Sequence, residues 1–349
     1  MSFHYNKRIR VMIVDDSMLA RRIIRDGLSK YQNIEVVGEA VNARDARNKI
    51  PILKPDVITS DVEMPGMSGI DFVKHILPEY PIPIILVSSL DLRVFDALAV
   101  GAVDFVRKPD GMNGKEHFIE SLANKIVVAS CSRVIKRSNT AMMSNSPVSK
   151  LTFTSQFNNE IIIGLGASTG GTEATLDVLK RLPANTPGMV VVQHMPPGFT
   201  KMYADRLDKS CALNVKEAQT GDVIKTGQVL IAPGDKQMTV VKTGANYTVK
   251  CQAGPKVSGH CPSVDVLFKS MAENVRCRMA GIIMTGMGSD GANGLLAMKQ
   301  KGAFTIGQDK DSCVVYGMPM VAQNIGAVTV QASCENIAGV LVRKLNQWR

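Results

Sequence analysis

Residues 161–171 read IIIGLGASTGG and decide the fold of the second half of the chain. Three consecutive isoleucines are typical of a short strand that is covered on both faces of a sheet. The apolar spacing of residues 173–181 then predicts a helix. Ser168 is therefore expected at a strand-to-helix turn, in the pattern G-x-S-x-G that Gly166 and Gly170 complete.

A serine on such a turn is a candidate nucleophile. Glycines let the backbone turn sharply and leave the hydroxyl uncovered, and the first N–H groups of a helix favour negative charge beside them. Two alternatives stay open at this point. A dinucleotide-binding turn, G-x-G-x-x-G, would need glycine where Thr169 stands, and a plain tight turn would carry no chemistry.

The composition describes a globular protein of two domains. The chain has 349 residues, of which 45% are hydrophobic and 21% charged. Seven scattered cysteines without a C-x-x-C pair predict free thiols in a reducing compartment. The apolar run at residues 11–14 is too short for a signal peptide, and no run reaches the roughly eighteen residues of a membrane span. We therefore predict a cytoplasmic location without membrane insertion.

The net charge of +10 raises the question of nucleic-acid binding. The excess lies in residues 131–158, which hold basic but no acidic residues, and in the second half of the chain. No dense basic helix with interleaved aromatic residues occurs, so nucleic acid is not the expected partner. A mildly positive surface suits an acidic macromolecular partner.

The first 128 residues alternate between strand and helix patterns, which predicts a doubly wound, five-stranded parallel sheet. The strand patterns lie at residues 10–14, 34–37, 57–60, 84–87 and 103–106. In such a sheet the functional groups gather at the carboxyl ends of the strands. The polar residues at these ends are Asp15, Asp16, Asp61, Ser88 and Lys108.

This set of side chains predicts phosphoryl chemistry. Three carboxylates in one pocket repel one another unless a cation shares them, and hard oxygen ligands suit Mg²⁺. A lysine and a hydroxyl beside them can hold the oxygens of a phosphoryl group. We therefore predict transfer of a phosphoryl group to a carboxylate, assisted by a metal ion.

The region resembles response-regulator receiver domains, which have a flavodoxin-like fold. The matching segments are Asp15-Asp16, residues 61–69 (DVEMPGMSG), Ser88 and residues 105–109 (FVRKP). The resemblance implies that Asp61 accepts phosphate from a histidine kinase. It also implies that Asp15, Asp16, Asp61 and the carbonyl of Glu63 hold Mg²⁺. Ser88 and Lys108 would bind the phosphoryl oxygens. Phe105 would be the aromatic ring that changes rotamer on activation.

Residues 129–158 are rich in serine and lack periodicity, so we interpret them as a linker. Residues 159–349 alternate again and predict a second doubly wound parallel α/β domain. Residues 228–251 contain three short strand patterns separated by turn residues, and we interpret these as an antiparallel insertion beside the main sheet.

Three polar residues follow predicted strands of this second domain. Ser168 follows residues 161–165, His194 follows residues 189–193, and Asp290 lies just past residues 280–284. If these strands share one sheet, a hydroxyl, an imidazole and a carboxylate meet at one rim, as nucleophilic acyl transfer requires. Taken singly, His194 could be a turn residue and Asp290 a helix N-cap.

The second domain also resembles a known family, the chemotaxis protein-glutamate methylesterases. The matching segments are residues 166–173 (GASTGGTE), 193–199 (QHMPPGF), 231–235 (IAPGD), 262–268 (PSVDVLF) and 285–291 (TGMGSDG). The order Ser, His, Asp differs from the Ser, Asp, His order of α/β-hydrolases, which match poorly.

This resemblance implies hydrolysis of glutamyl methyl esters on chemoreceptors and deamidation of certain receptor glutamines, with no cofactor for hydrolysis. It implies Ser168 as nucleophile, His194 as base and then acid, and Asp290 as the orienting carboxylate. It also implies an oxyanion donor at the N–H of Met287, with Thr169 close by. The unphosphorylated receiver would cover this site. The competing interpretation is a response regulator whose second half binds a receptor or nucleic acid without catalysis.

Overall fold

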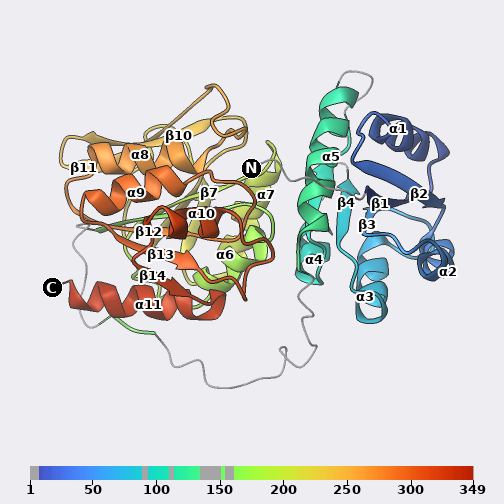
Figure 1. Ribbon diagram of the computed structural model, residues 1–349. Helices are drawn as coiled ribbons and strands as arrows, with labels where there is room; N and C mark the ends of the chain where they lie inside the picture. The colour runs from blue at the N-terminus through green and yellow to red at the C-terminus, as the bar shows by residue number, and fades with distance from the viewer. Residues whose placement is uncertain (1–7, 89–92, 110–113, 134–150, 154–160, 349) are drawn as a thin grey trace. The chain divides into compact units, whose positions relative to one another are not determined.

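The computed structural model describes residues 8–88, 93–109, 114–133, 151–153 and 161–348 (Figure 1). Contacts between Cα atoms divide the chain into two compact units, Met1–Met143 and Ser144–Arg349. The last helix of the first unit, α5 (Lys115–Ser130), ends two residues beyond the predicted domain boundary at residue 128. Most of the predicted linker, residues 129–158, lies outside the described residues.

The first unit is the predicted five-stranded parallel sheet, with strand order β2-β1-β3-β4-β5. Its strands are β1 (Ile9–Val14), β2 (Ile34–Ala40), β3 (Val57–Asp61), β4 (Ile84–Ser88) and β5 (Asp104–Arg107). Its helices are α1 (Met18–Leu28), α2 (Ala43–Leu53), α3 (Gly69–Glu79), α4 (Arg93–Ala99) and α5. Helices α1 and α5 contact each other, and α3 contacts both α2 and α4, so the sheet lies between two helical layers.

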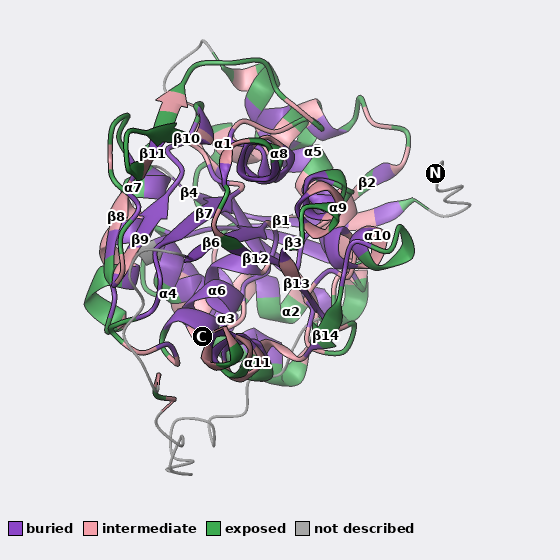
Figure 2. Ribbon diagram, turned by 90° about the vertical axis from the view of Figure 1, so that its left-hand side faces the viewer, coloured by how far each residue is buried: buried purple, intermediate pink, exposed green. Residues whose placement is uncertain are grey.

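The second unit is a parallel sheet of seven strands, in the order β14-β13-β12-β6-β7-β9-β8. Its strands are β6 (Ile161–Ala167), β7 (Met189–Gln193), β8 (Asn214–Glu217), β9 (Gln228–Ile231), β12 (Arg278–Ile283), β13 (Phe304–Gln308) and β14 (Val330–Ala332). Its helices are α6 (Gly171–Leu179), α7 (Phe199–Ser210), α8 (Val264–Asn274), α9 (Ala292–Gln300), α10 (Met318–Asn324) and α11 (Cys334–Gln347). Figure 2 shows the central strands β6 and β7 in the colour of buried residues, and every residue of both is buried. The isoleucine run thus forms the central strand that its composition predicts.

The predicted antiparallel insertion is correct for two of its three strands. Strands β10 (Gln237–Thr243) and β11 (Asn246–Gln252) form a separate antiparallel pair. The first predicted strand, β9, instead pairs in parallel with both β7 and β8 and belongs to the main sheet. Its apolar residues 229–231 are fully buried there, which is why the insertion begins only after the turn at residues 233–235.

Gly166 shows how tightly the central strand packs. It lies within β6, and a Cβ atom built on it would stand 2.2 Å from Cγ1 of Val264 at the start of α8. Its role is therefore close packing of a helix on the sheet. The sharp turn belongs to Gly170, whose φ of +75° lies in the left-handed region.

We expect Gly166→Ala to lower the free energy of unfolding by about 1–3 kcal/mol, because the added methyl group overpacks a filled core. Removing the opposing methyl groups in Gly166→Ala/Val264→Ala should make the double variant less destabilised than the sum of the two single changes. Thermal unfolding of all three variants and the wild type measures this coupling. Strict additivity would contradict the packing role.

Candidate active site and acidic pocket

The two neighbouring strands β6 and β7 bring Ser168 and His194 to one rim of the second sheet. Ala167 is the register partner of Gln193, so the residues that follow them leave the sheet side by side. The His194 N–H donates to Ala167 O at 3.1 Å. On the other side of β6, the Ser168 N–H donates to Thr285 O at 2.9 Å, just past the end of β12. The strand order of the sheet reverses between β6 and β12, beside this rim. Ligand sites in such folds usually lie at a reversal of this kind.

Asp290 and His194 form the imidazole–carboxylate pair that the sequence predicts. His194 Nε2 lies 2.8 Å from Asp290 Oδ2, and their side chains are only 6% and 1% exposed. A carboxylate accepts the hydrogen bond, so Nε2 carries the proton and Nδ1 keeps its lone pair. Nδ1 is buried and has no hydrogen-bond partner among the described residues. The nitrogen of His194 that could accept a proton is therefore Nδ1.

The Asp290 carboxylate is held by donors from the start of α8. Ser263 Oγ and the Asp265 N–H donate to Oδ1 at 2.7 and 3.0 Å, and the Val264 N–H donates to Oδ2 at 2.7 Å. Burial raises the pKa of Asp290, but the hydrogen bond and charge of His194 and these further donors outweigh burial and hold the pKa below its usual value. The lowered pKa indicates that Asp290 is ionised at neutral pH.

Ser168 is half-buried, and its hydroxyl makes no hydrogen bond to His194, since Nδ1 is unpaired. The backbone bond from His194 to Ala167 and the Gln193 side chain place Ser168 and His194 beside each other. In sites of this kind the nucleophile–base bond often closes only when substrate is bound. Gln193 helps to hold both residues, because its Nε2 donates to Ser168 O at 2.9 Å and to His194 O at 3.3 Å.

The segment around Met287 and Thr169 faces the same turn. The Gly286 N–H is already bonded to Val315 O at 3.0 Å, so it is not the donor for an oxyanion. The next N–H is that of Met287. Thr169 is buried, and its carbonyl accepts a hydrogen bond from Thr285 Oγ1 at 3.0 Å. A Cβ atom built on Gly286 would stand 2.6 Å from Ser168 Cβ, so only glycine lets the two segments approach so closely.

Two residues with a supporting role in this site were missed in the sequence. Gln193 gave no signal, because a glutamine at a strand end has no particular pattern. Ser263 had a usable signal: a serine directly before an apolar helical segment, with Asp265 in the first turn, is typical of a helix N-cap. What the pattern could not reveal is that the Ser263 hydroxyl also donates to Asp290.

The acidic pocket of the first unit lies at the carboxyl ends of β1 and β3. Asp15, Asp16 and Asp61 each offer a carboxylate oxygen, and these oxygens lie within 4.8 Å of one another. Lys108 Nζ lies 2.7 Å from Asp61 Oδ2 and 3.3 Å from Asp15 Oδ2. Burial raises the pKa of Asp15, with Lys108 opposing and Asp61 adding to the effect. This crowding of hard oxygen donors fits a divalent cation.

The other predicted residues of this pocket lie as follows. Ser88 ends β4 and is buried, and its Oγ has no hydrogen-bond partner in the part of the chain that the structure describes. Glu63 is exposed, and its N–H donates to Asp61 Oδ1 at 3.3 Å. Phe105 is 3% exposed and packs edge-on against Phe95, with ring centroids 6.3 Å apart. The Phe105 ring therefore points inward here.

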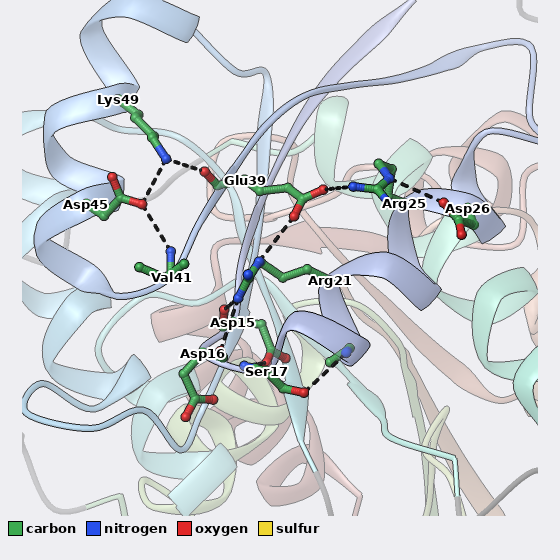
Figure 3. Close-up of polar contacts among 11 residues, drawn as sticks. Asp15, Asp16, Ser17, Arg21, Arg25, Asp26, Glu39, Val41, Asp45 and Lys49 are labelled. Atoms are coloured by element: carbon green, nitrogen blue, oxygen red, sulfur yellow. Dashed lines mark hydrogen bonds and ion pairs between the residues drawn. The ribbon is translucent and has the colours of Figure 1, made fainter.

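An arginine that the sequence did not single out, Arg21, holds the turn that carries Asp15 and Asp16; we call this arrangement the clamp. Arg21 Nη1 donates to the carbonyl oxygens of Asp15 at 2.7 Å and Asp16 at 3.1 Å, and its Nε donates to Glu39 at 3.1 Å (Figure 3). Glu39 lies on β2 and also accepts a bond from Arg25. The Arg21 side chain is 11% exposed, so this clamp is largely shielded from water.

The fold and these two sites define a class of protein: a receiver unit joined to a parallel α/β unit with a serine, histidine and aspartate at one rim. The profile of the CheB methylesterase family matches residues 163–341, and that of the response regulator receiver domain matches residues 11–116. The chain belongs to the CheB methylesterase family.

Individual relatives agree with this membership. A protein-glutamate methylesterase/protein-glutamine glutaminase 2 from Syntrophomonas wolfei subsp. wolfei is 51% identical over 98% of this chain and 99% of the relative. A protein-glutamate methylesterase/protein-glutamine glutaminase from Syntrophotalea carbinolica is 45% identical, with the same coverage. The crystal structure of the Thermotoga maritima CheB methylesterase catalytic domain is 37% identical, with a TM-score of 0.51, over 52% of this chain and 97% of that chain.

We expect Ser263→Ala to lower kcat roughly tenfold, because a hydrogen bond to a charged group is worth about 1.5–3 kcal/mol and its loss loosens Asp290. The loss of a helix N-cap should also lower the free energy of unfolding by about 1 kcal/mol. Because the pKa of Asp290 is lowered, its ionised form stabilises the fold at neutral pH, and that contribution is lost only as pH falls through the folded pKa. The effect on kcat should therefore be constant across the neutral range.

The matched control for this prediction is Asn42→Ala, which removes the side-chain cap of α2 in the other unit. It should cost similar stability and leave kcat unchanged. Steady-state kinetics and thermal unfolding of both variants make the comparison. Equal kcat in Ser263→Ala and the wild type would contradict the positioning of Asp290 by Ser263.

Proposed function

We propose that this chain is a phosphorylation-activated serine hydrolase of chemotactic adaptation. Its reaction is the hydrolysis of glutamyl methyl esters on chemoreceptors, and it also deamidates certain receptor glutamines. The observation that carries the proposal is the buried His194–Asp290 pair at the rim where Ser168 follows β6. Family membership and the printed names of the relatives support the same reaction.

The proposed chemistry uses Nδ1 of His194 as the base. Ser168 Oγ attacks the ester carbonyl carbon while Nδ1 takes the hydroxyl proton, and Asp290 keeps its bond to Nε2–H and stabilises the imidazolium. The N–H of Met287, beside Thr169, donates to the developing oxyanion; such a donor is worth roughly 3 kcal/mol.

The second half of the cycle reverses the proton transfer. Collapse of the intermediate breaks the C–O bond to the methoxy group, which leaves as methanol with the proton from Nδ1. Water then hydrolyses the glutamyl–serine ester by the same route. A glutamine substrate follows the same steps with ammonia as the leaving group.

The first unit is proposed to act as the switch. Asp61 accepts phosphate from the histidine kinase of the chemotaxis system, and Lys108 and Ser88 bind the phosphoryl oxygens. Asp15, Asp16, Asp61 and the Glu63 carbonyl would hold Mg²⁺, which supplies positive charge to offset the crowded oxygens. The added charge of the phosphoryl group draws Lys108 and Ser88 to the phosphoryl oxygens. This movement allows Phe105 to change rotamer, and turnover rises as a result.

None of the described helices is both long and apolar enough to cross a membrane. The proposed substrates are methylated glutamates of receptors, and the proposed phosphodonor is a kinase. We infer that the chain meets both in the cytoplasm.

The first test is methanol release from methylated receptor membranes, with and without a small-molecule phosphodonor and Mg²⁺. We expect release to rise with phosphodonor in the wild type and to fall by several orders of magnitude in Ser168→Ala. Asp61→Asn should release methanol at a rate that does not respond to phosphodonor. Release that persists in Ser168→Ala would exclude Ser168 as the nucleophile, and a response retained in Asp61→Asn would exclude Asp61 as the phosphorylated residue.

A second test concerns the clamp on the acidic pocket. Arg21→Ala should weaken Mg²⁺ binding about tenfold, since residues that orient metal ligands contribute on this scale. Isothermal titration with Mg²⁺ measures it without reference to activity. The matched control is Arg22→Ala, because Arg22 is 72% exposed and pairs only with Asp26 among the described carboxylates. Equal Mg²⁺ affinity in the two variants would contradict the clamp.

A further inference from the structure

A second histidine lies against the proposed base. The rings of His260 and His194 are stacked, with centroids 3.7 Å apart and planes inclined by 12°. His260 lies in the loop between β11 and α8, which is distant in sequence from the strand ends that carry Ser168 and His194. A single histidine in a loop gives no signal in the sequence, and none of the steps proposed above uses it.

The loop that carries His260 is built to hold its position. Val257 and His260 exchange two backbone hydrogen bonds of 2.9 Å. The two residues between them, Ser258 and Gly259, have φ values of +52° and +83°. Positive φ at both central positions defines the tight turn that closes a two-residue hairpin. The ring of His260 is thus presented from a fixed turn.

This turn is tied back to Asp290 through one buried glutamine. Gln237, at the start of β10, donates from Nε2 to Pro255 O at 2.9 Å and to His260 O at 3.3 Å. Its Oε1 accepts the Ser263 N–H at 2.9 Å, and the Ser263 hydroxyl donates to Asp290. A closed circuit of contacts therefore runs from His194 through Asp290, Ser263, Gln237 and His260 back to His194.

The stacking restricts the orientation of the His194 ring. Among the described residues, the His194 ring has one hydrogen bond, at Nε2, and its Nδ1 has no partner. A ring held by its Cβ–Cγ bond and by one hydrogen bond can still rotate about the line that joins them, and this rotation moves Nδ1 away from the serine proton. A second ring at van der Waals distance over its face blocks that motion.

We propose that His260 is a positioning residue of the hydrolase reaction, which stacks on His194 and holds the base in the plane from which Nδ1 receives the serine proton. The proposal rests on the proposed function, since it requires His194 to be the base. Its effect belongs to the transition state and so falls on kcat, with KM unchanged.

The test compares His260→Ala with His260→Phe in the full chain at saturating phosphodonor. We expect His260→Ala to lower kcat about tenfold, the size of a well-formed aromatic pair, with an unchanged KM. His260→Phe keeps a flat ring but no ring nitrogen, and it should stay within about threefold of the wild type. The control is Lys256→Ala, an exposed residue of the same loop, which should leave both constants unchanged.

A spectroscopic measurement makes the test independent of activity. In protein labelled at its five histidines, the carbon-bound ring protons of His194 should show an upfield ring-current shift from His260. His194→Gln identifies these signals. The shift should be lost in His260→Ala and retained in His260→Phe.

The outcomes separate this proposal from the proposed function. If the wild type releases no methanol under any condition, the proposed function is overturned. Methanol release that persists in Ser168→Ala would overturn only the serine mechanism in which His194 is the base, and with it the role of His260. If Ser168→Ala is inactive but His260→Ala matches the wild type, only the role of His260 is wrong. A His260→Phe variant as slow as His260→Ala, or a change in KM alone, would overturn positioning by stacking and indicate that the ring nitrogens contact substrate.

Discussion

The second unit depends on one buried carboxylate. Asp290 accepts hydrogen bonds from the imidazole of His194, the hydroxyl of Ser263 and the N–H groups of Val264 and Asp265. Burying an ion without partners is costly, and here the positive end of α8 and a helix-capping hydroxyl stabilise it. The same bonds join three segments distant in sequence. They also fix the imidazole tautomer, so the folding of α8 and the chemistry of Nδ1 depend on the same contacts.

Close approach of backbone segments, which two glycines permit, positions the other parts of this rim. Gly166 lets α8 lie against the central strand, and Gly286 lets the segment past β12 approach Ser168. Each glycine removes a side chain where two elements must meet, and the N–H and C=O groups thus brought together are paired, as between Ser168 and Thr285. These paired backbone groups fix the position of the segment that carries Ser168, and groups placed before substrate binds favour catalysis.

The two units use one architectural rule for two kinds of chemistry. In both, a parallel sheet gathers side chains at the carboxyl ends of its strands. In the first unit these are carboxylates with Lys108 between them, so like charges are crowded and a cation or phosphoryl group can be accommodated. In the second unit they are a hydroxyl, an imidazole and one well-compensated carboxylate, which suits proton transfer. The difference lies in which residues end the strands.

The sequence alone determined the alternation of strands and helices, the five-stranded sheet, the acidic set around Asp61 and the rim that gathers Ser168, His194 and Asp290. The strands and helices follow from local periodicity. The two sets of site residues follow from the rule that side chains at the carboxyl ends of parallel strands gather at one edge of the sheet. Tertiary structure alone decided that β9 belongs to the main sheet. It also decided that β8 and β14, short strands with little apolar pattern, form the two edges of that sheet. It further decided that Nδ1 of His194 has no hydrogen-bond partner among the described residues, and that Gln193, Ser263 and His260 contact Ser168, Asp290 and His194. These features depend on side-chain directions between residues far apart in sequence, on which local pattern carries no information.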